Sequence, residues 1–598
     1  MRGLTRLAPP LLLATALVWS AAGPAGAVAP PAKVPEAVGW GGAVSTVSAE
    51  ATAAGIEVLR KGGNAVDAAV AAAAALGVTE PYSSGIGGGG YFVYYDHATG
   101  RVHTIDGREI AGRTADAGLF LEGGKPLAFP DAVTSGLSVG VPGTAATWDD
   151  ALKQWGTRSL AENLEPAERI ADDGFVVNAT FRGMTEDNFG RFKDFPATAK
   201  LYLPGGRLPE VGSVLRNPDL AATYRQLGKD GTKAFYQGDI ARDVVDTLQH
   251  PPVDPASGRN ARPGKVDAAD LASYKVRRQA PTHVAYRDYD VYSIAPSSSG
   301  GTTVGEALGI LENGDVPGYS STQYYHHFLE ASRIAFADRN RWVGDPRFSD
   351  VPAKELLAPD YAASRACLIS PDKALTSPLA PGDPYDPADP ADCAEGGQAV
   401  PEPYEGQNTT HLTVADRWGN VVAYTLSIEQ TGGSGITVPG RGFLLNNELT
   451  DFDFAPLAAG VPDPNLPGPG KRPRSSMSPT IVLRDGEPLL ATGSPGGATI
   501  ITTTLQVLLG RLDRGLSLEQ AIAAPRASQR NAAATQAEPG FLALPERSAL
   551  EALGHGFSPV AEIGAATGVE RLPDGRWVAA AEPVRRGGGA AAVVTPAG

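Results

Sequence analysis

Residues 408–428 read NTTHLTVADRWGNVVAYTLSI, and this stretch contains two runs with the alternating pattern of β-strands. The runs, residues 411–417 and 421–428, flank Trp418-Gly419-Asn420, which is a typical turn sequence. The stretch therefore predicts a β-hairpin. The segment before it, residues 354–405, is rich in Pro, Asp and Gly, a composition that favours an exposed loop. An exposed loop that ends at a strand start is a good place for a chain break.

The junction of loop and strand offers a nucleophile, Thr409. The chain has no G-x-S-x-G elbow and no S-x-x-K set. A threonine hydroxyl needs a base, and a cut before Thr409 would supply one, because a free α-amine titrates near pH 8. The same hydroxyl could make the cut by attacking the carbonyl of Asn408. A second interpretation stays open, in which the Thr-Thr pair reflects only the β-propensity of threonine.

The N-terminal part predicts two helices, a turn and a strand. Ser48 to Arg60 forms one helix, with Ser48 as its N-cap. Asn64 starts a second helix, whose body, Ala68–Leu76, is apolar on nearly all sides and should be buried. The glycine-rich turn at residues 81–90 matches a dinucleotide-binding pattern. We reject that interpretation, because the pattern requires a strand before it and a helix after it, and here the order is reversed.

Composition excludes several classes of function. The 598 residues carry a formal net charge of -15, which argues against nucleic-acid binding. The eight histidines are scattered and form no metal-ligand set, so we expect neither a metal nor a cofactor. The two cysteines, Cys367 and Cys393, either form a disulfide or remain separate thiols; the sequence favours neither.

Residues 1–29 have the pattern of a signal peptide. Arg2 and Arg6 precede a short apolar run at residues 11–19, and small residues with two Ala-x-Ala cleavage patterns follow. A membrane anchor is disfavoured, because the run is too short to cross a bilayer. We therefore expect an exported, extracellular protein that is not held in a membrane after the leader is removed.

Ten separated segments resemble the γ-glutamyltranspeptidases, a family of N-terminal-nucleophile hydrolases, over nearly the whole mature length. They are residues 62–69 (GGNAVDAA), 80–90 (EPYSSGIGGGG), 107–109 (GRE), 140–143 (GVPG), 296–303 (PSSSGGTT), 335–346 (AFADRNRWVGDP), 409–414 (TTHLTV), 444–452 (LLNNELTDF), 471–480 (KRPRSSMSPT) and 493–497 (GSPGG). The resemblance implies an α/β fold, a four-layer αββα sandwich. It also implies self-cleavage between Asn408 and Thr409 into a large subunit, residues 30–408, and a small one, residues 409–598. Both would form one interwoven domain and remain together as a heterodimer.

The resemblance also assigns the catalytic residues. Thr409 matches the family's nucleophile, and Ser427 matches a hydroxyl residue that hydrogen-bonds it. Gly496 and Gly497 match the pair whose N–H groups form the oxyanion hole, a role that suits glycine because the backbone must approach the developing anion.

The family's donor pocket binds a zwitterionic group, with one carboxylate and one ammonium. Arg108 matches the arginine that holds the α-carboxylate of the γ-glutamyl donor, and a planar guanidinium suits that task. Ser475 and Ser476 match hydroxyls on the same carboxylate, while Glu448 and Asp451 match the positions that hold the ammonium. The chain departs from the common pattern at Glu429, where many members have asparagine. That carboxylate would either strengthen the grip on the ammonium or, if directed at Arg108, repel the donor.

The implied reaction is γ-glutamyl transfer from an amide such as glutathione to water, an amino acid or a peptide, through an acyl-enzyme at Thr409. Three alternatives remain at this point. A relative of the same fold acts as a glutaryl-type cephalosporin acylase, and another anchors poly-γ-glutamate to cell walls. From another class, the chain could be an uncut binding protein without catalysis.

Overall fold

Thirteen strands of the described residues form one antiparallel hydrogen-bonded system. The computed structural model describes residues 32–391, 393, 396–406 and 408–597, so the expected leader lies outside them. The first sheet runs in the order β8 (Arg277–Gln279), β3 (Arg101–Gly107), β2 (Gly89–Asp96), β12 (Val421–Ser427), β11 (Thr410–Asp416), β1 (Glu36–Thr46) and β20 (Ala590–Pro596). The second sheet runs in the order β19 (Trp577–Ala581), β18 (Thr567–Arg571), β14 (Glu487–Gly493), β13 (Thr480–Arg484), β10 (Tyr289–Ser293) and β9 (Thr282–Tyr286).

Strand β1 joins the two sheets, and they then pack face to face. Residues 36–39 of β1 pair with β19, and residues 39–46 pair with β20. Val93 and Ala423 of the first sheet share a buried apolar cluster with Ile481 and Val569 of the second. This cluster is the core between the two sheets.

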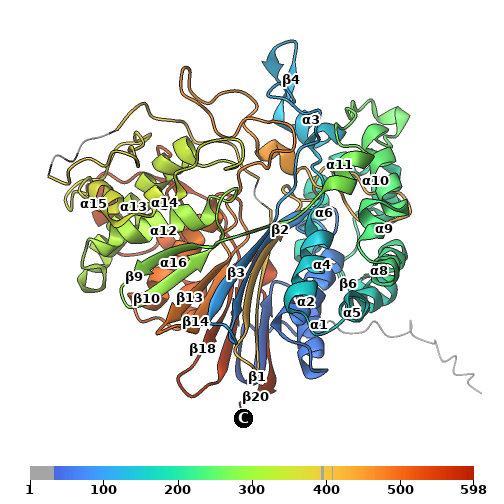
Figure 1. Cartoon of the computed structure of the whole chain (residues 1–598), viewed down its shortest axis with the longest axis horizontal. Coiled ribbons are helices and arrows are strands. Elements are labelled where there is room, and N and C mark those ends of the chain that lie inside the picture. Colours follow the sequence, from blue (N-terminus) through green and yellow to red (C-terminus); the bar gives the residue numbers. More distant parts are fainter. Residues whose placement is uncertain (1–31, 392, 394–395, 407, 598) are drawn as a thin grey trace, which may run out of the picture.

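Helices cover both outer faces of the sheet pair (Figure 1). Helices α1 (Ala49–Arg60) and α2 (Ala65–Thr79) share a buried cluster with first-sheet residues such as Leu412 and Tyr424. Helices α12 (Gly300–Glu312) and α16 (Thr499–Leu512) pack on the second sheet, and α13 (Ser321–Trp342) packs against α12. The result is the expected four-layer αββα sandwich.

The helix signals near the N-terminus are confirmed. The Ser48 hydroxyl accepts from the N–H of Ala51 and caps α1. Asn64 and Asp67 form a reciprocal capping box at the start of α2, and every residue of α2 is buried. These caps satisfy helix N–H groups that would otherwise lie unpaired in the interior.

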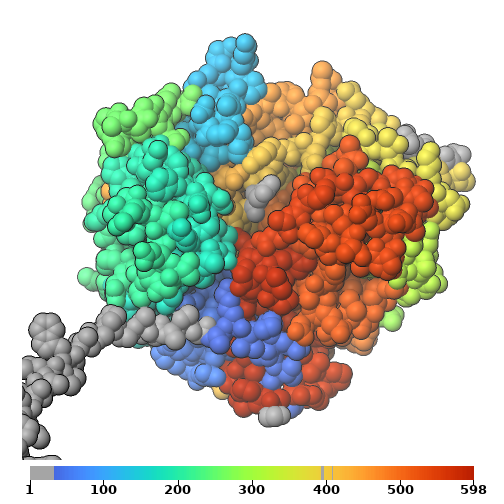
Figure 2. Space-filling model, turned by 180° about the vertical axis from the view of Figure 1, so that it is seen from behind, coloured from blue at the N-terminus to red at the C-terminus, as the bar shows by residue number. Residues whose placement is uncertain are grey.

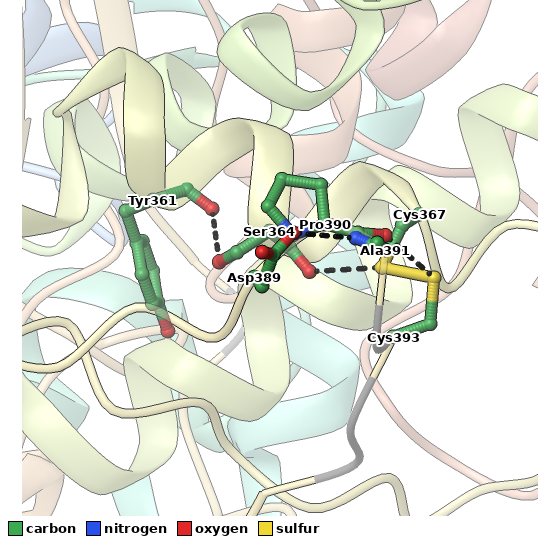
Figure 3. Close-up of a disulfide and its surroundings, with 7 residues drawn as sticks. All are labelled: Tyr361, Ser364, Cys367, Asp389, Pro390, Ala391 and Cys393. Atoms are coloured by element: carbon green, nitrogen blue, oxygen red, sulfur yellow. Dashed lines mark hydrogen bonds between the residues drawn. A yellow bond between two sulfur atoms is a disulfide. The ribbon is translucent and has the colours of Figure 1, made fainter.

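Two features follow from tertiary packing and not from local composition. Residues 354–405 do not form one exposed loop. They include part of α14 (Ala353–Leu356) and all of α15 (Pro359–Ala366), and the end of this segment, near Glu405, is buried. Cys393 in this segment forms a disulfide with Cys367 at the end of α15, with the Cα atoms 5.5 Å apart (Figure 3).

Among the described residues, no helix has both the length and the apolar character needed to cross a bilayer.

The expected cut would fall at the middle of the first sheet. Strand β11 begins at Thr410 and lies between β1 and β12. Strands from both sides of residue 408 alternate in the sheet, so the two predicted subunits are interwoven. The predicted hairpin of β11 and β12 is confirmed, with His411 opposite Thr425.

Candidate active site

Thr409 lies at the start of the central strand β11 and is only 4% exposed. Its Oγ1 lies 3.5 Å from the Oγ of Ser427, at the end of the neighbouring strand β12. The Ser427 hydroxyl donates to the carbonyl oxygen of Asn408 at 2.9 Å. The hairpin register therefore places Ser427 against both the expected nucleophile and the carbonyl that this nucleophile would attack.

The Asn408–Thr409 peptide is fixed by residues from two distant parts of the chain. The Asn408 side chain donates to the carbonyl of Tyr82 at 2.8 Å and accepts from the hydroxyl of Ser83 at 3.1 Å. Arg586 donates to the carbonyl of Thr409 at 2.7 Å and to the side chain of Asn408. These contacts hold one conformation of the bond that is expected to break.

Gly496 and Gly497 form the turn between β14 and α16. Both have positive φ, +134° and +57°, a region that favours glycine. Gly497 lines the same small cavity as Thr409 and Ser427. The turn therefore presents backbone beside the expected nucleophile, as an oxyanion hole requires.

Arg108 is buried among acidic groups. It pairs with Glu448 and with Asp451, and it donates to the carbonyls of Pro473 at 3.3 Å and Arg474 at 2.9 Å. These four hydrogen bonds occupy four of the five N–H groups of a guanidinium. In the uncut chain Arg108 is thus almost fully engaged.

Glu429 completes an acidic wall with Glu448 and Asp451. Its backbone has φ +78°, and its N–H donates to the Ser427 hydroxyl at 2.7 Å. Its carboxylate accepts from the side chain of Asn447. Burial and the charges of Asp451 and Glu448 raise the pKa of Glu429, and burial raises the pKa of Glu448 to about 7 although Arg108 opposes the change.

The chain segment before the expected cut fills the side of the site where the donor is expected to bind. We name residues 402–406 the linker. Gly406 packs against Glu429, and the carboxylate of Glu405 accepts from the Ser476 hydroxyl and pairs with Arg339. Only about 20 Å³ stays free between Arg108, Thr409 and the linker, about the room of one water.

A larger cavity of about 650 Å³ lies on the other side of the linker. Its lining includes Tyr404, Gly496, Glu562 and Arg586. In Figure 2 the yellow segment near residue 400 borders the red C-terminal residues on this face. The cavity adjoins the glycine turn through Gly496, and its lining includes none of the acidic residues Glu429, Glu448 and Asp451.

The structure thus brings together all the site residues expected from the sequence. Sequence reasoning missed four neighbours: Arg339, Arg474, Glu405 and Arg586. Arg339 and Arg474 lie inside segments quoted for the resemblance, so those segments held a signal for them. Arg586, far along the chain in a run RRGGG, offered none.

The chain is similar to known proteins over most of its length. The sequence profile described as Gamma-glutamyltranspeptidase matches residues 51–593. A glutathione hydrolase proenzyme of Bacillus subtilis is 40% identical over 534 residues, covering 88% of this chain and 87% of the relative. An acylase ACY 1 proenzyme of a Pseudomonas species is 34% identical and covers 93% and 95%. The crystal structure of a cephalosporin acylase from Bacillus halodurans superposes with a TM-score of 0.80 at 27% identity, covering 95% and 98%.

Proposed function

Because the chain belongs to the γ-glutamyltranspeptidase family, we propose that it is a precursor that cuts itself between Asn408 and Thr409. The chain is a γ-glutamyl-transferring and -hydrolysing enzyme. The expected products of the cut are residues 30–408 and 409–598, which stay together as a heterodimer. The observation that carries the proposal is the position of Ser427, with its hydroxyl on the Asn408 carbonyl and beside the Thr409 hydroxyl.

Self-cleavage would proceed by an acyl shift. Thr409 Oγ1 attacks the carbonyl carbon of Asn408, while Ser427 donates to the oxygen on which negative charge develops. The C–N bond then breaks, the proton from Oγ1 reaches the departing amine, and an ester joins Asn408 to Thr409. Water hydrolyses this ester, which leaves a carboxylate on Asn408 and a free α-amine on Thr409.

The new α-amine is the base for turnover. It takes the proton of Oγ1 as this oxygen attacks the γ-carbonyl of the donor, and it returns a proton to the leaving amine. The N–H groups of Gly496 and Gly497 hold the oxyanion. Water or the amine of an amino acid or peptide then attacks the ester on Thr409 and releases the acyl group.

The donor would lie where the linker lies in the uncut chain. Glu448, Asp451 and Glu429 line the cavity beside Thr409 and offer carboxyl oxygens to the donor ammonium. Arg108, Ser475 and Ser476 are assigned to its carboxylate. We propose a glutathione-like donor for this site and export of the enzyme by residues 1–29. A glutaryl donor, which lacks the ammonium, would leave the acidic wall without a partner, so this second candidate is disfavoured.

Denaturing electrophoresis of the purified protein tests the proposal. Two fragments of roughly 380 and 190 residues are expected from the cut site and leader. Sequencing the smaller fragment should begin at Thr409-Thr410-His411. Thr409→Ala should remain a single chain without activity on γ-glutamyl anilides; a variant that still splits at this bond would exclude the mechanism.

A further inference from the structure

The short turn η6 (Arg585–Gly587) carries Arg586, which contacts the peptide that is expected to break. Its Nη1 donates to the carbonyl oxygen of Thr409 at 2.7 Å. Its Nη2 donates to the hydroxyl of Ser83 at 3.0 Å and to the side-chain oxygen of Asn408. None of these bonds goes to the backbone carbonyl of Asn408, the group that Thr409 would attack. Arg586 therefore orients the residues on both sides of the expected cut without contacting the attacked carbonyl.

The backbone of η6 needs support from other segments. Arg586, Gly587 and Gly588 have φ angles of +56°, +73° and +77°, so three consecutive residues lie in the left-handed region. This region is unfavourable for arginine. Because such residues cannot continue a right-handed helix or a strand, contacts from outside must fix the position of Arg586.

Contacts within residues 409–598 hold one side of η6. The guanidinium of Arg585 pairs with the carboxylates of Glu538 and Glu582. The backbone N–H of Arg586 donates to the carboxylate of Glu562 at 3.1 Å. These contacts fix the first half of the turn.

Lys33 holds the other side of η6. Its Nζ donates to the carbonyl oxygens of Gly587 at 3.2 Å and Gly588 at 2.6 Å. Among the described residues, no other group donates to these two carbonyls. Lys33 and Arg586 also lie near the same carboxyl: burial raises the pKa of Glu80, and the charges of Arg586 and Lys33 oppose that rise.

Backbone hydrogen bonds anchor the segment that carries Lys33. The carbonyl of Val34 accepts from the N–H of Ala591 in β20, and the carbonyl of Pro35 accepts from the N–H of Ala581 in β19, both at 2.7 Å. Strands β19 and β20 are the two that η6 connects. The Lys33 side chain is therefore held against this connection.

We infer that Lys33 is a positioning residue for self-cleavage: it fixes η6, and η6 places Arg586 on the Asn408–Thr409 peptide. The inference rests on the proposed self-cleavage and extends it to a residue near the start of the expected large subunit. In the described chain Lys33 makes no hydrogen bond to Asn408 or Thr409, so it acts through η6. Displacing a reacting group by about 1 Å can cost about a hundredfold in rate, so a modest shift of η6 is enough to slow the cut.

Lys33→Met removes the ammonium and keeps most of the side-chain length. The half-time of self-cleavage, followed on denaturing gels after cell-free synthesis is stopped, should lengthen about tenfold, the loss expected for a hydrogen bond from a charged donor. Lys33→Arg should recover most of the rate, because a guanidinium can still donate to two carbonyls.

Arg60→Met is the matched control. Arg60 also joins the N-terminal part of the chain to a carbonyl of β20, that of Val594 at 3.2 Å, outside η6. This variant should be cut with the half-time of the unmodified chain. An unchanged half-time in Lys33→Met would overturn the inference. If the unmodified chain itself stays uncut, the proposed self-cleavage fails instead.

A double variant tests whether Lys33 acts through Arg586. Arg586→Lys keeps the charge but loses the planar fork that contacts Thr409, Ser83 and Asn408, so it should be cut slowly. Adding Lys33→Met to this variant should lengthen the half-time much less than tenfold, because coupled residues are not additive. A full tenfold effect in both backgrounds would mean that Lys33 acts independently of Arg586 and would refute the inference.

Backbone hydrogen exchange in the uncut Thr409→Ala chain gives a test without cleavage. Adding Lys33→Met should raise exchange in residues 586–589 and 408–410, while the buried helix α2 keeps its protection. Adding Arg60→Met should leave both segments unchanged. Unaltered exchange there would show that η6 does not depend on Lys33. A rise throughout the chain would show that Lys33 adds only general stability, and either result would exclude the positioning role.

Discussion

Ser427→Ala should slow self-cleavage without preventing folding. The Ser427 hydroxyl accepts from the N–H of Glu429 at 2.7 Å and faces the Thr409 hydroxyl at 3.5 Å. Its single hydrogen is therefore directed to the Asn408 carbonyl, 2.9 Å away. This carbonyl oxygen becomes the oxyanion when Thr409 attacks. Loss of one donor to such an oxyanion costs roughly 3–4 kcal/mol of activation free energy, or about a hundredfold to a thousandfold in rate.

The rate of self-cleavage can be followed after cell-free synthesis of the chain. Synthesis is stopped with a translation inhibitor, and samples taken at intervals are run on denaturing gels. The half-time for conversion of the single chain into two fragments should lengthen by that factor in Ser427→Ala, and Ser427→Thr should recover most of the rate. Ser434→Ala is the matched control, because this buried hydroxyl also donates to a carbonyl at 2.9 Å, that of Leu445, away from the cut. If Ser427→Ala matures with the half-time of the unmodified chain, Ser427 does not act on the scissile carbonyl.

Three further outcomes concern Arg108, His411 and the Cys367–Cys393 disulfide. In Arg108→Lys the lysine side chain cannot pair with Glu448 and Asp451 at once. The KM for the donor should therefore rise tenfold or more while self-cleavage continues, and an unchanged KM would mean that Arg108 does not bind the donor. Burial lowers the pKa of His411 to about 3, so below pH 6.5 the unfolded chain takes up a proton that the folded chain does not. This group should lower the free energy of unfolding by about 1.4 kcal/mol for each pH unit below that point. Urea titrations between pH 6 and 4 should therefore show a slope of unfolding free energy against pH that is smaller by that amount in His411→Gln. The control His250→Gln, at an exposed position, should keep the slope of the unmodified chain. Replacing Cys367 and Cys393 by serine should cost about 3.5 kcal/mol for a separation of 26 residues, measured as a lower urea midpoint; an equal midpoint would mean that the bond adds no stability.

Much of the fold was predictable because its signals are local. The alternation in residues 411–417 and 421–428 sets the hairpin, and the caps at Ser48 and Asn64 set the first two helices. The hairpin register alone brings Ser427 to Thr409. These elements follow from backbone hydrogen bonding and side-chain periodicity within some twenty residues, which a sequence displays directly.

The missed parts depend on contacts between distant segments. The composition of residues 354–405 favours an exposed loop, yet the ion pair of Glu405 with Arg339 holds its end inside the site. Arg586 reaches Thr409 across 177 positions, from a C-terminal run whose composition indicates only a turn. Such pairs are set by the packing of the two sheets and have no local pattern.

The strongest test of donor identity is Glu429→Gln. The carboxylate of Glu429 accepts from Asn447, and its pKa is raised by burial and by Asp451 and Glu448, with Arg108 a minor influence. It therefore belongs to the acidic wall and should bind the donor ammonium. The variant should lower kcat/KM for a γ-glutamyl anilide by about tenfold, with little change for a glutaryl anilide.

The pH dependence gives a second signature of the same wall. Donor binding should weaken as the pH falls through about 7, where Glu448 takes up a proton and one negative charge is lost. The pKa of Glu448 is set by burial, Arg108 and Asp451, so this loss should stay at about the same pH in Glu429→Gln. An equal rise in kcat/KM for the γ-glutamyl and glutaryl anilides would instead mean that Glu429 faces Arg108 and competes with the donor carboxylate. No change in either rate would make Glu429 a structural residue, held by Asn447 and Ser427 alone.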